Sequence, residues 1–197
     1  MDMRPVVNVV LAGLGGQGVV KASDILAEAA FRAGLDVKKA EVHGMSQRGG
    51  AVQSYLRLSD RPVFSDLIPL GKADLILSVE PMESLRYLPY LSQEGYVVTN
   101  TTPYKNIVNY PDIVLVMDTI RKLPRVVAID AEAIAREIGN SKVSNMVMLG
   151  AATPFIDIAI EGLEDGIREI FGRKGELLVN LNLRALYAGR EFAEANK

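Results

Sequence analysis

The stretch that decides the fold is residues 6–34, VVNVVLAGLGGQGVVKASDILAEAAFRAG. It opens with a short β-branched run at residues 6–11, which is typical of a buried parallel strand. Apolar residues then recur at helical spacing through residues 18–33, and Gly34 is suited to end that helix. A second strand is expected at residues 37–42. The N-terminal part therefore predicts a strand–helix–strand unit.

The loop inside this unit, residues 13–18, fits the pattern G-x-G-x-x-G. Glycines at such a position allow a tight turn, and the free N–H groups at the start of the helix attract a phosphate. Glu41, near the end of the second strand, lies where such a site holds a ribose hydroxyl. An equally weighted alternative is that the glycines only allow close packing of strand, loop and helix. The candidate anion-binding residues of this loop are Gly13, Gly15, Gly16, Gln17 and Gly18.

A second glycine-rich loop, HGMSQRGG at residues 43–50, follows the second strand directly. Strand ends line the ligand crevice in a doubly wound sheet, so we expect this loop to lie beside the first. Arg48 is a candidate to bind a carboxylate or phosphate with two hydrogen bonds, although an ordinary ion pair explains it as well. Met45 is suited to pad an apolar cavity. The candidate partner or active-site residues are His43, Met45, Ser46, Gln47, Arg48, Gly49 and Gly50.

The rest of the chain alternates between strand and helix patterns. Residues 51–58 alternate in polarity, which favours a half-exposed strand over a central one. Residues 111–123 favour a helix opened by Pro111 and Asp112. A buried strand is predicted at residues 73–79, and further strands are predicted at residues 95–100 and 126–129. Together the segments predict an α/β fold with a Rossmann-like doubly wound, mostly parallel sheet. Helices cover both faces, the C-terminal third is helical, and residues 1–197 form one domain.

The composition excludes several classes of site. The chain has 22 Lys and Arg against 24 Asp and Glu, and a net charge of -2 argues against a nucleic-acid or anionic-membrane binder. It has no cysteine and one histidine, so we expect no iron–sulfur cluster, no thiolate zinc site and no other metal site. No apolar run reaches membrane-spanning length, and the start lacks a signal-peptide cleavage pattern. A cytoplasmic location is therefore expected.

The two glycine loops and the helix between them, GLGGQGVVKASDILAEAAFRAGLDVKKAEVHGMSQRGGAV, resemble the gamma subunits of 2-oxoacid:ferredoxin oxidoreductases. The stretch EVHGMSQRGG at residues 41–50 is similar to the beta subunits of the indolepyruvate type. Further similar segments follow, so the resemblance covers nearly the whole chain. These segments are ADLILSVEPMESLRYLPYL, NMVMLGA and KGELLVNLNLRALYAG.

The resemblance implies a function in oxidative decarboxylation. In that reaction a 2-oxoacid, coenzyme A and oxidised ferredoxin yield an acyl-CoA, carbon dioxide and reduced ferredoxin. It also implies a large alpha subunit that carries thiamine diphosphate, Mg²⁺ and [4Fe–4S] clusters, with ferredoxin reached through the complex. This chain would bind no cofactor tightly and would be inactive alone. Coenzyme A, a co-substrate, would suit the first glycine loop and Arg48.

Other functions stay open on the residues alone. One is a stand-alone NAD(P)-dependent oxidoreductase, suggested by G-x-G-x-x-G and Glu41. Another is a nucleotide-binding module without catalysis, and a third is a family member that acts on pyruvate or branched 2-oxoacids. The mean hydropathy of +0.15 indicates apolar surface beyond a core, so we expect the isolated chain to self-associate, as a homodimer.

Overall fold

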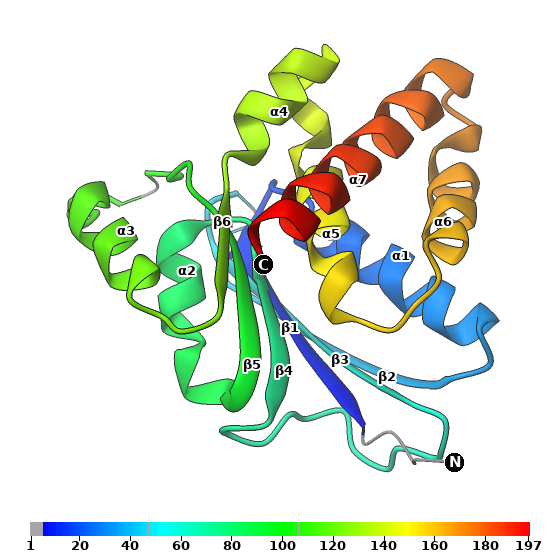
Figure 1. Cartoon of the computed structure of the whole chain (residues 1–197), viewed down its shortest axis with the longest axis horizontal. Coiled ribbons are helices and arrows are strands. Elements are labelled where there is room, and N and C mark those ends of the chain that lie inside the picture. The colour runs from blue at the N-terminus through cyan, green and yellow to red at the C-terminus, as the bar shows by residue number, and fades with distance from the viewer. Residues whose placement is uncertain (1–5, 47, 106) are drawn as a thin grey trace.

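A computed structural model describes residues 6–46, 48–105 and 107–197, and six strands in it form one sheet in the order β2-β3-β1-β4-β5-β6 (Figure 1). The strands are β1 (Val7–Leu14), β2 (Asp36–His43), β3 (Ala51–Ser59), β4 (Ala73–Ser78), β5 (Leu91–Asn100) and β6 (Val126–Ile129). The helices are α1 (Val19–Arg32), α2 (Pro81–Arg86), α3 (Ile113–Arg121), α4 (Ala131–Ile138), α5 (Ser144–Ala152), α6 (Ile160–Gly172) and α7 (Glu176–Asn196). Short 3₁₀ turns lie at Leu88–Tyr90, Ser141–Val143 and Thr153–Phe155.

The sheet is mixed but mostly parallel, as predicted. Strands β1, β4, β5 and β6 pair in parallel, whereas β3 runs antiparallel to both of its neighbours, β1 and β2. Because β3 lies between β1 and β2, the first two strands are not adjacent as in a simple strand–helix–strand unit. Strand β2 becomes an edge of the sheet.

The expectation that residues 51–58 form a half-exposed strand was wrong. Strand β3 is interior, and both of its faces are covered. Ser54 and Leu56 are fully buried on the face that packs against α1. On the other face Tyr55 is buried against Tyr90, with ring centroids 5.5 Å apart. The alternating polarity of residues 51–58 therefore does not mark a face exposed to solvent. One face of β3 packs against α1, and the other packs against Tyr90.

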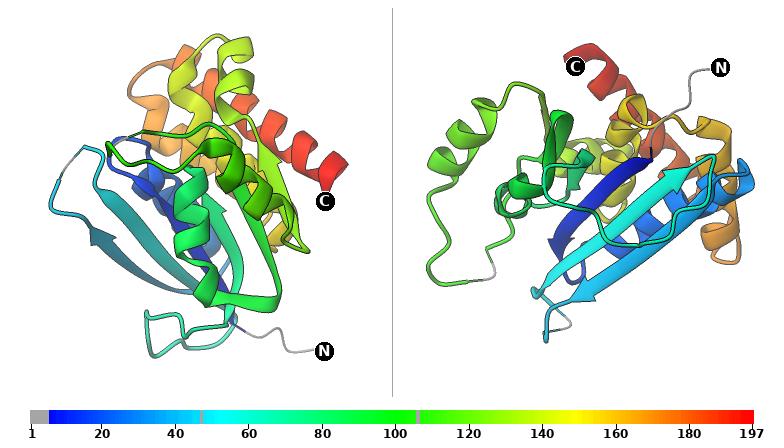
Figure 2. Two further views of the ribbon diagram at one scale, coloured as in Figure 1. Left: turned by 90° about the vertical axis from the view of Figure 1, so that its left-hand side faces the viewer. Right: turned by 90° about the horizontal axis from the view of Figure 1, so that it is seen from below.

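Helices cover both faces of the sheet, which confirms the predicted layers (Figures 1 and 2). Helices α1, α5, α6 and α7 lie on one side, and α2 and α3 lie on the other. Helix α5 is buried along nearly its whole length and crosses α7 closely. A Cβ atom at Gly150 would lie 1.9 Å from the carbonyl oxygen of Leu186, and one at Gly189 would lie 1.9 Å from that of Val147. These two glycines therefore set the distance between the helices.

The ambiguous segment near residue 113 is a helix, as predicted. The side chain of Asp112 accepts a hydrogen bond from the N–H of Val114 at 2.9 Å and so caps α3. The predicted helical C-terminal third is also confirmed by α5, α6 and α7. Over the residues described, none of the helices combines the length and apolar character needed to cross a membrane.

Candidate functional site

The first glycine loop links the carboxyl end of β1 to α1. Gly16 and Gly18 have φ values of +100° and +79°, which only glycine adopts readily. A Cβ at Gly13 would lie 2.3 Å from Val79, and one at Gly18 would lie 2.4 Å from the amide nitrogen of Asn145. A Cβ at Gly16 would meet no atom within 4 Å. Crowding thus explains the first and last glycines of the motif, while Gly16 faces open space.

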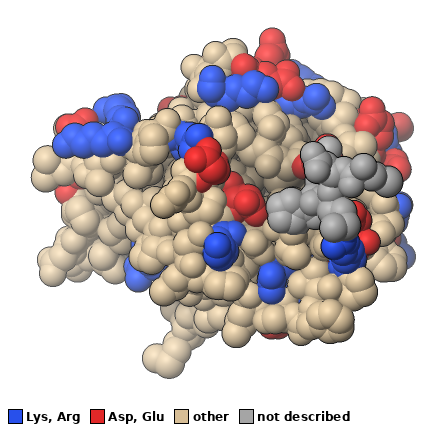
Figure 3. Space-filling view, turned by 60° about the horizontal axis from the view of Figure 1, so that its bottom comes forward, with Lys and Arg blue, Asp and Glu red and all other residues tan. Residues whose placement is uncertain are grey.

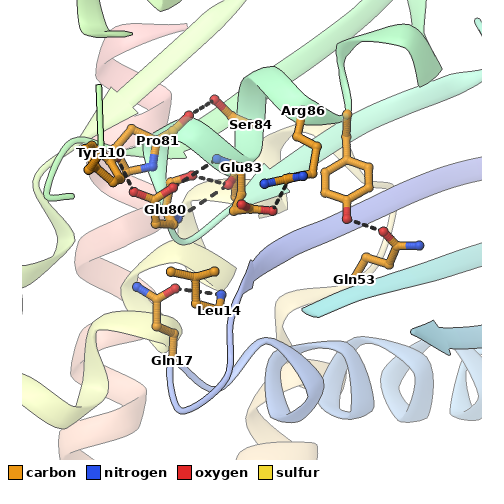
Figure 4. Close-up of polar contacts among 11 residues, drawn as sticks. Leu14, Gln17, Gln53, Glu80, Pro81, Glu83, Ser84, Arg86 and Tyr110 are labelled. Atoms are coloured by element: carbon orange, nitrogen blue, oxygen red, sulfur yellow. Dashed lines mark hydrogen bonds and ion pairs between the residues drawn. The ribbon is translucent and has the colours of Figure 1, made fainter. Parts of the chain in front are cut away.

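Gln17 shapes this loop from within (Figure 4). Its side-chain oxygen accepts a 2.9 Å hydrogen bond from the N–H of Leu14, and its side-chain nitrogen donates to the carbonyl oxygen of Val79 at 3.3 Å. The amide is therefore used on both sides to fasten the loop to the residue that follows β4. The sequence predicted that Gln17 would bind an anion. In the structure its side chain instead holds the loop in place.

The two glycine loops lie side by side, as predicted. The N–H of Gly15 donates to the carbonyl oxygen of Gly50 at 2.8 Å, and the N–H of Gly49 donates to that of Gly15 at 3.1 Å. The cause is the antiparallel pairing of β3 with β1, which places Ala51 opposite Leu14. Gln47, another predicted residue of the second loop, lies outside the described residues.

Between the loops and α1 is a cleft of about 720 Å³, called here the first cleft. The start of α1 has no side-chain cap and no acidic residue in its first turn, so its N–H groups can receive an anion. Arg48 is exposed on the adjoining loop and forms no ion pair within the described part of the chain. Met45 is fully exposed. The lining includes Gly15, Gly16, Gly18, Val19, Val20, Lys21, Asp24, His43, Gly44 and Ser46.

A row of charges on β2 leads to this cleft. The imidazole of His43 lies 3.1 Å from the carboxylate of Glu41, which also pairs with Lys39, and Lys39 reaches Asp24 on α1. Partial burial acts to raise the pKa of Glu41, but hydrogen bonds from Lys39 and His43 together hold that pKa below its ordinary value. The carboxylate of Glu41 is thus already paired with Lys39 and His43, and β3 separates its strand, β2, from β1. This arrangement gives little support to a ribose contact.

A second cleft of about 430 Å³ lies on the other side of the first glycine loop, at the carboxyl ends of β4 and β5. Asn100 organises it: its amide donates to the carboxylate of Glu132 at 2.7 Å and accepts from the N–H of Ala131 at 3.2 Å. No motif in the sequence pointed to this cleft, apart from the polar end of the strand predicted at residues 95–100. The lining is Gly16, Gln17, Val79, Asn100, Tyr104, Glu132, Ser141, Lys142, Ser144 and Met148.

The wall of the second cleft is anchored by Glu80, which is fully buried (Figure 4). Its carboxylate caps α2 by accepting from the N–H of Glu83 at 3.0 Å. It also accepts from the hydroxyl of Tyr110 and the N–H of Tyr104, which fastens the segment between β5 and α3. Burial raises the pKa of Glu83, against the opposing effect of its ion pair with Arg86.

The comparisons with known proteins agree with this arrangement. A family model described as pyruvate ferredoxin/flavodoxin oxidoreductase matches residues 8–192. The chain belongs to this family. The resemblance seen in the sequence is therefore confirmed.

Several family members are similar over nearly the whole chain. The indolepyruvate oxidoreductase subunit IorB of Archaeoglobus fulgidus is 39% identical over 92% of this chain and 92% of that protein. The common gamma subunit of the pyruvate/ketoisovalerate oxidoreductases of Pyrococcus furiosus is 32% identical over 83% of this chain and 86% of that protein.

Solved structures of the family share the fold. A keto/oxoacid ferredoxin oxidoreductase gamma subunit from Geobacter sulfurreducens has a TM-score of 0.71 and 26% identity, with 96% of this chain and 99% of that chain covered. The 2-oxoglutarate:ferredoxin oxidoreductase of Magnetococcus marinus has a TM-score of 0.79 and 23% identity. The match covers 98% of this chain and 32% of that longer chain, and at this identity it shows the fold alone.

An iron–sulfur cluster does not fit this chain's own residues. The sequence has no cysteine, so it supplies no thiolate for an iron–sulfur cluster. In the described parts of the chain, no three His, Asp or Glu side chains lie close enough together to hold a metal ion. Each cleft instead offers the uncapped start of a helix, α1 or α5, together with one basic and one acidic side chain, which are Lys21 and Asp24 in the first cleft and Lys142 and Glu132 in the second.

Proposed function

We propose that this chain is the small subunit of a 2-oxoacid:ferredoxin oxidoreductase and that its first cleft holds the phosphates of coenzyme A. The observation that carries the proposal is the meeting of both glycine loops at the uncapped start of α1. The partial positive charge there suits a polyanionic ligand, Lys21 lines the cleft together with Asp24, and Arg48 is exposed on the adjoining loop. The relatives IorB and the common gamma subunit are both named as subunits of oxidoreductases, which supports the proposal that this chain also functions in a complex with other subunits.

The thiamine diphosphate, Mg²⁺ and [4Fe–4S] clusters of the reaction would belong to a large partner subunit. When bound there, they supply the carbanion chemistry and the single-electron transfers to ferredoxin. The present chain would contribute by positioning coenzyme A for acyl transfer and by excluding water from the joint site. A cytoplasmic location of this complex is part of the same proposal.

The segment at residues 60–72, between β3 and β4, supports a partner surface. Phe64 is 96% exposed, and Leu67 and Leu70 are 62% and 67% exposed. The segment is nevertheless held firmly, because the guanidinium of Arg57 donates to the carbonyl oxygens of Ser65 at 2.9 Å and Leu67 at 3.2 Å. A fixed loop that presents apolar side chains loses little entropy on binding. We propose that it contacts the large subunit.

One face of the molecule is sparsely charged. Figure 3 shows a face on which residues other than Lys, Arg, Asp and Glu predominate. Surface of this kind is common at the interfaces of permanent complexes. It agrees with a chain that functions inside an assembly.

The proposed substrate is an arylpyruvate such as indolepyruvate. It is supported by the identity of 38–39% to four IorB subunits, against 30–32% to four gamma subunits of pyruvate/ketoisovalerate enzymes. Pyruvate or a branched 2-oxoacid is the alternative substrate. An NAD-dependent function is less well supported, because β3 separates Glu41 from β1.

The test begins with tagged chain purified from its own host without oxygen. We expect an iron-rich large subunit to co-purify and the complex to reduce a dye when arylpyruvate and coenzyme A are both present. Calorimetric titration should show coenzyme A binding that Arg48→Ala weakens about tenfold, the effect of losing a charge-assisted hydrogen bond.

Arg184→Ala is the matched control, since Arg184 is also exposed and lies on α7, outside the lining of the first cleft. This control should leave the affinity unchanged. A chain that purifies alone, or a complex whose affinity for coenzyme A is insensitive to Arg48→Ala, would refute the proposal.

A further inference from the structure

Strand β2 leaves one side of its backbone unpaired. It is the outermost strand next to β3, and Figure 2 shows it along the margin of the sheet. The N–H of Gly44 donates to the carbonyl oxygen of Ala51 at 2.7 Å, so the alternation of an antiparallel ladder turns the even-numbered residues of β2 toward β3. In the part of the chain that the structure describes, no group bonds to the outward N–H and C=O groups, which belong to Val37, Lys39, Glu41 and His43.

This free edge lacks most of the features that prevent strands from pairing. Strand β2 has eight residues, contains no proline and keeps an unbroken register with β3. The opposite edge of the sheet, β6, has only four residues. The charged side chains of β2 are mixed in sign, with Asp36 and Glu41 against Lys38 and Lys39. Such an edge repels a strand that brings like charges opposite and accepts one that brings the complementary order.

The sequence of β2 is complementary to itself when two copies run antiparallel. A two-fold axis perpendicular to the sheet keeps each side chain on its own face, so odd-numbered residues lie opposite odd-numbered ones. With Ala40 on that axis, Lys39 lies opposite Glu41 of the second copy, and Val37 lies opposite its His43. All the outward N–H and C=O groups then have partners. An axis at Lys39 or Glu41 would place that charge opposite the same charge of the second copy.

The pairing also suits the side chains on both faces of the sheet. On the face toward α1, Lys39 and Glu41 already bind each other within one chain, so two such pairs would form an alternating row of charges. On the other face Lys38 lies opposite Val42, whose side chain is 51% exposed. The methylene stem of the lysine can cover this apolar group. The small side chain of Ala40 lets the two strands meet at the axis.

Exposed apolar residues come together at each end of the paired strands. The N–H of Val63 donates to the carboxylate of Asp36, which fastens the segment after β3 to the start of β2. In this register Asp36 lies opposite Gly44 of the second copy, and Met45 follows directly. Phe64 and Met45, both almost fully exposed in the single chain, therefore lie at the same end of the pairing.

We infer that the isolated chain forms a two-fold dimer in which β2 pairs antiparallel with β2 of a second copy, with Ala40 on the axis, so that two sheets become one. Phe64 is also proposed to contact the large subunit, so the dimer describes the chain without that subunit. The inference does not depend on the proposed function. Light scattering of the purified chain should give twice its mass of 21.4 kDa.

A cysteine on the axis tests the register. The chain has no cysteine, so Ala40→Cys introduces one thiol, which lies opposite the same thiol of the second copy. Opposite residues at such a position have Cα atoms roughly 4.5 Å apart, within the range of a disulfide. We expect oxidised glutathione to link most of the chain into a covalent dimer on a non-reducing gel, and reduction to reverse the link.

Val42→Cys is the matched control, because residue 42 is on the same face of the same strand and is more exposed than Ala40. In the inferred register the two copies of residue 42 are separated along the strands by roughly 13 Å, which is too far for a disulfide. Val42→Cys and Lys38→Cys should each remain unlinked alone. A mixture of the two variants should form a disulfide between them.

Charge reversal tests the pairing without any thiol. Lys39→Glu places like charges opposite each other and should weaken the dimer at least tenfold, and Glu41→Lys should do the same. Mixing the two variants restores opposite charges across the axis and should restore a dimer that contains one copy of each. Circular dichroism of each variant checks that the chain is folded.

Each other result overturns the inference. Equal linkage of Val42→Cys and Ala40→Cys would indicate random collision or a different register. A dimer that Ala40→Cys does not link would have its contacts elsewhere on the surface. A monomer of the unaltered chain would leave the edge of β2 to solvent or to a strand of another protein. None of these results bears on the proposed function, which is tested by coenzyme A binding to the complex.

Discussion

Gly15 and Gly50 are joined by a main-chain hydrogen bond of 2.8 Å, although 35 positions separate them in the sequence. The bond exists because β3 returns antiparallel along β1 and brings the end of the second loop to the start of the first. The two loops of the proposed coenzyme A site are therefore one backbone unit, and a change in either should be felt in both.

Gly50→Ala should disturb the site through this connection. The added Cβ would lie 2.4 Å from the carbonyl oxygen of Ser46, so the second loop must shift. We expect the affinity of the complex for coenzyme A to fall about tenfold, or about 1.4 kcal/mol, in a calorimetric titration. Gly172→Ala, where a Cβ meets no atom within 4 Å, should leave binding intact. Equal affinity in the Gly50→Ala variant would show that the loops act independently.

Gly189→Ala should destabilise the whole chain. Its Cβ would lie 1.9 Å from the carbonyl oxygen of Val147, and two buried helices cannot separate without opening the core. We expect a loss of about 3 kcal/mol or more in the free energy of unfolding, measured in urea. If residues 1–197 form one domain, far-ultraviolet circular dichroism and tyrosine fluorescence should report the same transition. Two separate transitions would contradict that prediction.

Glu41→Gln should change how stability depends on pH. The pKa of Glu41 is below its ordinary value in the folded chain, so the carboxylate stabilises the fold above the unfolded pKa of about 4.5. That contribution is lost as the pH falls through the folded value. We expect the variant to be less stable by up to about 1 kcal/mol at pH 7, with the difference shrinking as the pH falls from 4.5 through the lower pKa of the folded chain. A difference that is constant from pH 7 to pH 3 would be inconsistent with this ion pairing.

Phe64→Asp should weaken association through the segment at residues 60–72. The exposed ring would be replaced by a charge that is costly to desolvate. We expect light scattering to show the isolated chain as a homodimer and the variant as a monomer, with the affinity for the large subunit at least tenfold lower. Ser65→Asp, a charge on the adjacent exposed residue, is the control and should have a smaller effect. If the Phe64→Asp variant still forms the dimer and still binds the large subunit with the same affinity, the contacts lie outside residues 60–72.

Local patterns in the sequence were sufficient for most elements. The helix after Gly18, the helix capped by Asp112 and the buried strands formed where spacing and capping residues predicted them. These features depend on contacts within a few residues, so the sequence records them directly. The roles of Gly13 and Gly18 were less accessible, since they depend on Val79 and Asn145, which lie far along the chain.

The sequence by itself determined the α/β class, the absence of thiolate ligands and the family, because composition, periodicity and the two loop motifs are all local. Only the tertiary structure decided that β3 lies between β1 and β2, that Glu41 is paired with Lys39 and His43, and that a second cleft adjoins Gly16. Strand order and cleft shape depend on which distant surfaces bury each other. That choice is made by the packing of the whole chain, and no short segment encodes it.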